Sequence, residues 1–394
     1  MSLQKDRTRS SVKGLGTLSV RETSPSAGTT FDEVGGLDGE TGTVLEDFSD
    51  LEEIVAETGN LEDVKEKSRV TRLSTNLLQT SIDEINLNKQ STAKTHALRY
   101  YGMHSPGRFQ YFCIPKGRIN PGVALGFRSG KRVLPLRAWA LKQSDLAFDY
   151  PEYLMAETKG LIRIKDLQLW INPRDIYAPE AGTAKLFDIS GWERHGDLNS
   201  DYATIWQTGT PDRFLRFDGV NDFCDFGNIL SINATDNMMF EVWVKVLAAN
   251  ATEVPFIDKA NATLVKGYHF QRNSLNNVSI TLKDNINPDV TAASATTLLQ
   301  NIWAHLVFVV DRGNQTLKLY RNAVADGAPA SLTSMGDTTT TDPFKIAVFG
   351  SATLYGNFET GGFRIYNFGA GGLPSDIATI ILNHYNAEKS YFGL

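Results

Sequence analysis

The sequence LRFDGVNDFCDFGN at residues 215–228 decides the fold of the larger part of this chain. Two short apolar runs flank Asp-Gly-Val-Asn-Asp, whose residue types are typical of a tight turn between β-strands. Strict alternation is clearest in MMFEVWVKV at residues 238–246, where Phe240, Val242 and Val244 are separated by residues that face the other way. Strand-like runs also begin at Leu167, Trp303 and Gly361. Regularly spaced short strands over residues 162–394 predict one large antiparallel sandwich.

These segments resemble the concanavalin A-like, laminin G-like jelly-roll family. LFDISGWERHGDL at residues 186–198 is similar to the family's D-x-S-G-x-x-x-H-G element, and LRFDGVNDFCDFGN is similar to its x-F-D-G-x-N-D-x-V-x-x-G strand. FEVWVKV, NIWAHLVFVVD, LYRNA and GGFRIYNFGAGGLPSDIATII resemble later family strands. The resemblance implies this jelly roll for nearly all of residues 162–394. The matched positions are Asp188, Ser190, Gly191, His195, Gly196, Phe217, Asp218, Gly219, Asn221, Asp222 and Gly227.

The same fold hosts lectins, calcium-dependent binding modules and glucanases, so the resemblance alone does not define an activity. A glucanase needs two carboxylates about 5 Å apart when it retains configuration, and these usually come from one strand face. No E-x-D-x-x-E run occurs, and Glu241 stands alone among apolar neighbours in its strand. We therefore expect no catalytic residues and no enzyme activity.

A calcium site is the one metal site that the sequence offers, at four oxygen-bearing side chains. The candidate ligands are Asp218, Asn221, Asp222 and Asp225. The favoured alternative is that these side chains cap backbone amides in a tight turn, with no cofactor bound. In the neighbouring motif, we interpret Trp192 as a packing residue and His195 as a histidine whose hydrogen bonds are satisfied, in preference to ligand binding.

Glycan binding would call for exposed aromatic rings beside polar amides. Tyr355, Asn357 and Phe358 are the candidate glycan-contact residues. No convergent polar pocket is legible in the sequence, so we expect weak binding that gains strength from repeated copies.

Composition argues against several functional classes. The 394 residues carry 39 Lys and Arg against 45 Asp and Glu, a net charge of −6, which is unlike a protein that neutralises nucleic-acid phosphates. Cys113 and Cys224 are too few for a disulfide framework or a four-cysteine zinc site, so we interpret them as buried thiols. The N-terminus lacks the apolar stretch of a signal peptide, and no apolar run is long enough for membrane insertion.

The first half of the chain is predicted to be a smaller β-rich domain. Residues 1–45 are rich in Ser, Thr and Gly and are expected to form a flexible arm. Ser49 and Glu52 have capping-box spacing, which predicts a short helix that ends at Gly59. A second helix is predicted from Ile82. The predicted strands begin near residues 70, 96, 109 and 131.

Charge is segregated along this half. Residues 31–66 contain thirteen acidic residues and one basic residue, whereas residues 85–144 contain eleven Lys and Arg and no acidic residue. The two stretches either form separate solvated faces or pair between neighbouring copies of the chain. The candidate subunit-interface residues are Asp50, Glu52, Glu53, Arg128, Lys131 and Arg132.

The order of these elements resembles the major tail tube protein of long-tailed bacteriophages, over residues 1–155. RVTRLSTNLLQTSIDEINL at residues 69–87 is similar to a strand that runs into a capped helical turn, and KRVLPLRAWALKQSD at residues 131–145 to the closing strand. The predicted organisation is an arm at 1–45, a tail-tube-like β-sandwich or barrel with small helices at 46–155, a linker at 156–161, and the jelly roll at 162–394.

The resemblance implies a virion structural protein, made in the host cytoplasm, that stacks in rings, expected to be hexameric, around the DNA-delivery channel. Its implied partners are copies of itself and other tail proteins (tape measure, tail terminator and baseplate), and DNA would pass through without sequence-specific binding. The jelly roll would then decorate the outside of the tail and contact host-surface glycans. The alternative is a carbohydrate-binding adhesin, carried on a tail fibre or a bacterial surface.

Overall fold

In a computed structural model the chain divides into two units, residues 1–157 and 158–394. Up to residue 158 the described residues are those of strands only. In the second unit they are residues 162–174, 184–199, 205–209, 213–260, 265–350 and 354–394.

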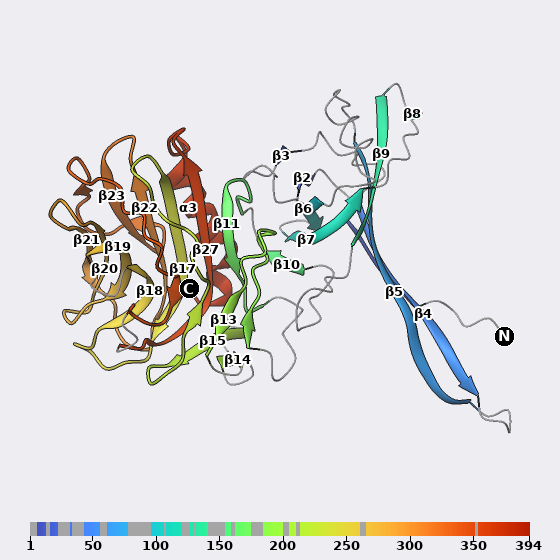
Figure 1. The fold of residues 1–394 in the computed structure, drawn as a ribbon, viewed down its shortest axis with the longest axis horizontal. Coiled ribbons are helices and arrows are strands. Elements are labelled where there is room, and N and C mark those ends of the chain that lie inside the picture. Colours follow the sequence, from blue (N-terminus) through green and yellow to red (C-terminus); the bar gives the residue numbers. More distant parts are fainter. Residues whose placement is uncertain are drawn as a thin grey trace. The chain divides into compact units, whose positions relative to one another are not determined.

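In the first unit, the described residues form one sheet with the central order β1-β4-β5-β9-β7-β6-β2-β3, to which β10 and β8 add beside β7 and β9. Figure 1 shows β4 and β5 as a long hairpin, paired from Val44↔Ser74 to Val55↔Leu61. The strands are β1 (Asp6–Val12), β2 (Gly16–Glu22), β3 (Asp32–Glu33), β4 (Thr43–Val55), β5 (Leu61–Leu77), β6 (His96–Ser105), β7 (Arg108–Ile119), β8 (Gly126–Arg128), β9 (Lys131–Ala140) and β10 (Leu154–Thr158).

Two expectations for this unit need correction. The segment predicted to be a flexible arm contributes β1, β2 and β3, because DRTRSSV and GTLSVRE find backbone partners in β4 and β6. The helix predicted after Ser49 is instead the second half of β4, whose backbone groups bond to β5 along its length. The capping-box spacing of Ser49 and Glu52 was therefore a coincidence within a strand rich in Val, Leu and Ile. The helix predicted from Ile82 lies outside the described residues.

The second unit is a sandwich of two antiparallel sheets. We call the nine-stranded sheet, as described, sheet I; its central order is β14-β15-β27-β17-β22-β23-β24, and β11 and β25 pair with β27 and β23. Its strands are β11 (Leu167–Ile171), β14 (Trp206–Thr208), β15 (Arg213–Asp218), β17 (Asn237–Val246), β22 (Trp303–Asp311), β23 (Thr316–Arg321), β24 (Val324–Ala325), β25 (Ala330–Ser331) and β27 (Asn357–Gly369).

Sheet II has eight strands among the described residues, in the order β12-β13-β16-β26-β18-β19-β20-β21. They are β12 (Lys185–Leu186), β13 (Gly196–Leu198), β16 (Cys224–Asp225), β18 (Val254–Ala260), β19 (Lys266–Arg272), β20 (Asn277–Asp284), β21 (Val290–Thr297) and β26 (Lys345–Ile346). The strand segments predicted at residues 167, 214, 238, 303 and 361 are confirmed. The mainly β, jelly-roll fold class is confirmed with them.

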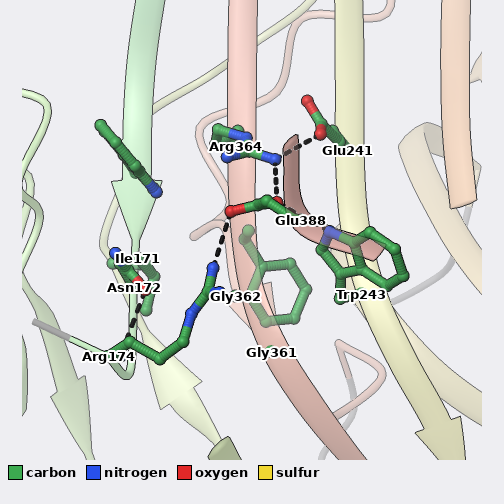
Figure 2. A pocket seen from close by; sticks show the side chains of 11 residues that line it. Ile171, Asn172, Arg174, Glu241, Trp243, Gly361, Gly362, Arg364 and Glu388 are labelled. Atoms are coloured by element: carbon green, nitrogen blue, oxygen red, sulfur yellow. Dashed lines mark hydrogen bonds and ion pairs between the residues drawn. The ribbon is translucent and has the colours of Figure 1, made fainter. Parts of the chain in front are cut away.

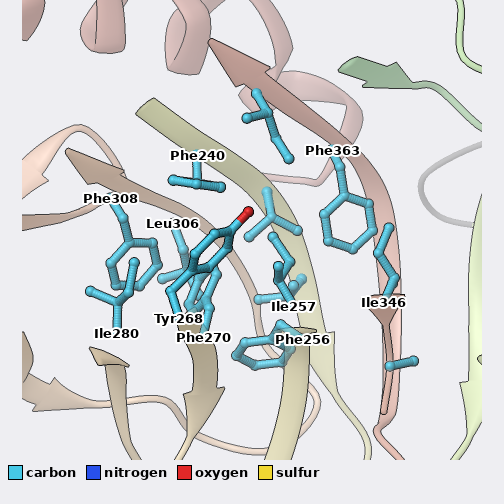
Figure 3. Packing of buried hydrophobic residues seen from close by; sticks show 14 of the residues in the cluster. Phe240, Phe256, Ile257, Tyr268, Phe270, Ile280, Leu306, Phe308, Ile346 and Phe363 are labelled. Atoms are coloured by element: carbon cyan, nitrogen blue, oxygen red, sulfur yellow. The ribbon is translucent and has the colours of Figure 1, made fainter. Parts of the chain in front are cut away.

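The hydrophobic core lies between sheets I and II. Figure 3 shows Phe240 of sheet I facing the Tyr268 and Phe270 rings of sheet II, and the Phe240 and Tyr268 ring centroids lie 5.2 Å apart. The buried Tyr268 hydroxyl donates to the Leu230 carbonyl oxygen at 2.7 Å, so its polar end is satisfied. Cys224 is also buried here and Cys113 is buried in the first unit, as predicted.

A helix, α3 (Ile377–Glu388), follows the last strand and continues into a 3₁₀ turn, η1 (Lys389–Tyr391). Figure 1 shows α3 beside β27, and its buried residues include Ile380, Ile381 and His384. The helix therefore covers the face of sheet I that points away from the core. In the part of the chain that the structure describes, no helix is long and apolar enough to cross a membrane.

Candidate functional site

A row of polar side chains crosses the outer face of sheet II. Directly paired residues on antiparallel strands lie on the same face, so the strand register defines this row. Residues one position away, such as Cys224, Ile346 and Phe270, belong to the core, which places the row on the opposite face. In strand order the row is Lys185, Asp197, Asp225, Lys345, Asp258, His269, Thr281 and Thr291.

Both ends of the row are internally paired. Lys185 forms an ion pair with Asp197, and the Lys345 Nζ lies 4.0 Å from an Asp225 carboxylate oxygen. At the other end, the Thr281 and Thr291 hydroxyls are hydrogen-bonded at 2.8 Å. These pairs leave the middle of the row as the part with free hydrogen-bonding capacity.

The middle of the row contains polar atoms that are buried without a hydrogen-bond partner. They are both carboxylate oxygens of Asp258, the His269 Nδ1 and the Gln271 Oε1. Asp258 lies opposite His269, and Gln271 follows His269 by two residues, so all three side chains share one face. Orphaned buried polar groups are costly and rare in folded proteins, and three together indicate a place built to receive hydrogen bonds.

The electrostatics of this spot follow from its burial. Burial raises the pKa of Asp258 to about 7, and the backbone amides of Gly350 and Ala260, with Lys345, only moderate the rise. Both amides lie close enough to favour the ionised carboxylate, but neither has the distance and angle of a full hydrogen bond to it. Burial likewise lowers the pKa of His269 to about 4, helped by the charge of Lys283, so this imidazole is neutral at pH 7.

Aromatic rings flank the row. The Phe349 ring meets the His269 ring edge-on, with centroids 5.4 Å apart. Nearer the ion-paired end, Phe223 lies 6.2 Å from Tyr355, and the Lys345 Nζ sits 5.9 Å from the centre of the Phe223 ring. Rings beside unsatisfied polar atoms form the combination that recognises a small polar ligand with apolar faces.

A second charged cluster lies under α3, on the outer face of sheet I (Figure 2). Glu241 on β17 is buried, and its Oε1 accepts hydrogen bonds from His305 at 2.8 Å and from Arg364 at 2.5 Å. Its Oε2 accepts from the His384 Nδ1 at 2.8 Å. Burial alone would raise the pKa of Glu241, but Arg364 and His384 outweigh it and hold the pKa well below its usual range.

Glu388, at the end of α3, completes this cluster. Its Oε2 accepts from Arg364 at 2.5 Å and from the Trp243 indole at 2.8 Å, and its Oε1 accepts from Arg174 at 2.7 Å. Against the cost of burial, Arg364 and then Arg174 lower the pKa of Glu388 to about 2. Figure 2 shows Arg364 between the two carboxylates.

The pocket that these side chains line has space for about one water molecule. Two carboxylates and two guanidinium groups balance each other in charge, and the four carboxylate oxygens are all bonded within the cluster, whereas the Arg174 Nε and Nη1, the Arg364 Nε and the His305 Nδ1 have no hydrogen-bond partner. A ligand of sugar size does not fit in this space. We therefore assign the cluster to holding α3 on sheet I.

The predicted calcium ligands serve the turn that contains them. Asp218 Oδ1 accepts from the Val220 amide at 2.7 Å, Asp222 Oδ2 from the Asp218 amide at 3.1 Å, and Asp225 Oδ1 from the Gly227 amide at 2.7 Å. The Asn221 side chain is exposed. This is the backbone-capping arrangement that the turn interpretation predicts. Among the described residues, no three His, Cys, Asp or Glu side chains come together to hold a metal ion.

The three candidate glycan-contact residues do not form one surface. Phe358 is buried in the core against Phe217, with ring centroids 5.2 Å apart, so its assignment as a glycan contact is wrong. Successive strand residues face opposite sides, so Asn357 and Phe358 cannot share a face. Tyr355 is half-buried and lies beside Phe223, at the edge of the polar row.

His195 is half-buried and hydrogen-bonded, which agrees with its interpretation as a satisfied histidine. Its Nδ1 accepts from the Asp188 amide at 3.0 Å, and its ring packs edge-on against Phe187 at 5.4 Å. Burial lowers the pKa of His195 to about 3, helped by Lys185. The Trp192 indole donates to the Leu167 carbonyl at 2.8 Å, which ties the turn to β11.

The candidate interface residues lie in the first unit. Asp50, Glu52 and Glu53 are on β4, Arg128 is on β8, and Lys131 and Arg132 are on β9. Their side chains lie outside the described residues, and the structure gives only their strand register.

Sequence reasoning missed the residues of both clusters. Asp258, His269 and Gln271 carry no motif, and only the strand register brings them together. Helix α3 had a usable signal, because Ile377, Ile380, Ile381 and His384 follow helical spacing after Pro374.

Comparisons with known proteins support the jelly-roll fold of the second unit. Residues 218–368 match the family model of the concanavalin A-like lectin/glucanases superfamily, which confirms the family resemblance for this region. The matched region does not include the first unit, so the tail-tube resemblance stays a prediction. No curated protein sequence matches the chain.

Solved structures that resemble the chain include the binding domain of botulinum neurotoxin serotype D, at 13% identity and a TM-score of 0.41, over 56% of this chain and 51% of that chain. The chain thus spans about half the length of that binding domain. Another is CBM40 of the Ruminococcus gnavus IT-sialidase, at 13% identity and a TM-score of 0.33, over 43% of this chain and 96% of that chain. Domain 4 of a Geobacillus stearothermophilus arabinanase, solved with arabinotriose, has 16% identity and a TM-score of 0.34, over 45% of this chain and 78% of that chain.

Proposed function

We propose that residues 158–394 form a carbohydrate-binding module that holds a glycan on the outer face of sheet II. The observation that carries this proposal is the set of unpartnered polar atoms on Asp258, His269 and Gln271. A sugar offers hydroxyl groups that bond to such atoms and C–H faces that pack on rings such as Phe349. The match of residues 218–368 to a lectin and glucanase superfamily supports a glycan as the ligand class.

We propose binding without hydrolysis. Glu241 and Glu388 are both bonded to Arg364, and the pKa of each is lowered. A glycoside hydrolase of the usual type needs one carboxyl group with a raised pKa as general acid. On sheet II, Asp258 has a raised pKa, to which the charge of Asp342 contributes, but among the described strand residues its direct register partners are Lys345 and His269 and not a carboxylate.

The test is glycan-array binding of the full chain, compared with two site variants. We expect His269→Ala and Phe349→Ala to lose at least ten-fold in affinity for the glycans that the wild type binds. Glu253→Gln, at an exposed position directly before β18, is the matched control and should bind as the wild type does. Absence of binding to every glycan on the array would overturn the proposal.

A second candidate function, self-assembly through the first unit, is favoured by the strand register. In β4, Leu51 pairs with Glu66, whereas the other end of β5 pairs Leu77 with Leu134 of β9. Eleven residues of extended strand, about 36 Å, separate these two ends. Figure 1 shows the β4–β5 hairpin extending away from β8 and β9.

We propose that the acidic end of β4 and the basic ends of β8 and β9 meet between copies of the chain, in a head-to-tail contact that generates rings or tubes. We propose this contact as the basis of the tail-tube role. The test is sedimentation and negative-stain imaging of the protein with Arg128, Lys131 and Arg132 all changed to Glu. We expect wild-type assemblies that weaken with salt and a variant that stays monomeric. Assembly that is unchanged in the triple variant would overturn the contact.

A further inference from the structure

The hydrogen-bonding character of the site on sheet II identifies the kind of sugar that it would take. When Asp258 is ionised, three of the four unpartnered atoms, the two Asp258 oxygens and the Gln271 Oε1, only accept hydrogen bonds, so they need a ligand that donates. Sugar hydroxyl groups donate, whereas the carboxylate of an acidic sugar only accepts.

The cations around this site are already committed to carboxylates. Lys185 pairs with Asp197, Lys345 lies 4.0 Å from Asp225, and Lys283 pairs with Asp289 at 2.8 Å. The row contains three aspartates and two lysines, so this surface of sheet II carries no excess of positive charge. Among the described residues, nothing on this row is arranged to bind a carboxylate ligand as a bidentate arginine would.

We propose that Asp258, His269 and Gln271 form a subsite for two neighbouring hydroxyl groups of an uncharged sugar, and that this subsite rejects sugars that carry a carboxylate. The inference rests on the proposed function of this face. The two Asp258 oxygens accept one hydrogen bond from each hydroxyl. Gln271 and His269 lie on the adjacent strand. They bond to the hydroxyl oxygen or hydrogen atoms of the sugar that Asp258 leaves unbonded.

Burial of the Asp258 carboxylate makes its hydrogen bonds selective. Asp258 is 0% exposed, so its carboxylate oxygens have already lost their hydration. Only a ligand that forms hydrogen bonds with these oxygens compensates for this cost, and a ligand that does not form them binds more weakly. Above its pKa of about 7 the Asp258 carboxyl is ionised, so a ligand carboxylate placed there would also face a like charge in a site shielded from water. Phe349, whose ring edge contacts His269, is the residue placed to pack against the sugar ring.

A calcium ion is the competing occupant, because it too would bond to unpaired oxygens. Calcium takes six to eight oxygen ligands, and the described side chains offer three unpartnered oxygens here, beside the positive charge of Lys345. The test therefore includes a chelator.

The experiment measures binding of the full chain at pH 8, above the pKa of Asp258, with and without EDTA. The ligands are matched neutral and acidic oligosaccharides, such as lactose with sialyllactose and galactan with polygalacturonate fragments. Asp258→Asn and Gln271→Ala are the site variants, and Glu253→Gln is the control. We expect neutral sugars to bind, their acidic counterparts to bind at least ten-fold more weakly, and each site variant to lose at least ten-fold in affinity. EDTA should have no effect.

Tighter binding of the acidic partners would overturn the inference and leave the proposed function standing. Loss of binding in EDTA would replace the sugar subsite with a calcium site. Unchanged affinity in folded Asp258→Asn, or in Gln271→Ala if the first variant does not fold, would remove the subsite. Absence of binding to both neutral and acidic sugars would instead contradict the proposed function itself.

Discussion

The His384 Nδ1 on α3 donates a hydrogen bond to the Glu241 Oε2 on β17 over 2.8 Å. The other ring nitrogen of His384 accepts from the Arg163 amide at 2.9 Å, so the imidazole is neutral and its tautomer is fixed. Burial lowers the pKa of His384, and the attraction of Glu241 offsets this only in part. Through one histidine, the last helix, the central strand of sheet I and the start of the second unit are joined.

We expect Glu241→Gln to destabilise the protein by about 3 kcal/mol, because it leaves the buried Arg364 short of one counter-charge. Chemical denaturation followed by tryptophan fluorescence measures this change. The control is Glu253→Gln at an exposed position before β18, which should stay within about 0.5 kcal/mol of the wild type. Equal stability of the two variants would show that the network does not hold α3.

Phe392, near the end of the second unit, should contribute almost as much to the stability of the protein as Glu241 does. Its ring is buried and stacks on Trp243, with centroids 4.0 Å apart and planes 12° apart. We expect Phe392→Ala to cost about 2–4 kcal/mol, since it empties a packed site between α3 and sheet I. Leu394→Ala, at a position that is 42% exposed, is the control. Matching denaturation midpoints for the two variants would contradict this packing role.

His195 should make stability depend on pH in the acidic range. Its folded pKa of about 3 lies below the ordinary value of 6.5, so between these values the unfolded chain binds the extra proton. Stability contributed by the neutral imidazole is therefore complete above pH 6.5 and declines as the pH falls toward 3. Between pH 7 and pH 4, we expect the free energy of unfolding to fall by about 1–3 kcal/mol more in the wild type than in His195→Asn. Parallel stability curves for the two proteins would contradict this.

The second unit should fold without the first. Its core residues all belong to residues 158–394, and they include strands from both sheets. We expect a chain of residues 158–394 to give a cooperative thermal transition and the near-UV circular dichroism of packed aromatic rings. A non-cooperative transition, or loss of the near-UV signal, would show that the first unit is needed for folding.

Sequence reasoning predicted the jelly-roll strands because their signal is local. The alternation of Phe240, Val242 and Val244 is readable within nine residues, and so is the Asp218–Asp222 turn. The partners of Glu241 are not local: His305, Arg364 and His384 follow it by 64, 123 and 143 residues.

The site on sheet II was hidden for the same reason. Asp258 lies between Lys345 and His269 because β18 pairs with both β26 and β19, an order that no short motif encodes. In the first unit, the spacing of Ser49 and Glu52 predicted a helix, and the long pairing of β4 with β5 overrode it.

Asp258 should give the protein a pH dependence of opposite sign to that of His195. Its folded pKa of about 7 exceeds the ordinary 3.8, so the folded state binds the proton more tightly between these values. Stability therefore falls as the pH rises from 4 to 7, because the buried carboxylate must ionise without a hydrogen-bond partner. Asp258→Asn keeps the shape and removes the charge, so we expect it to stabilise the protein by about 1–3 kcal/mol at pH 8 and to change little at pH 4. Denaturant unfolding at both pH values, with Glu253→Gln as control, measures the difference. A variant that is less stable than the wild type at pH 8 would show that the carboxylate is paired in the folded protein and is not held ready for a ligand.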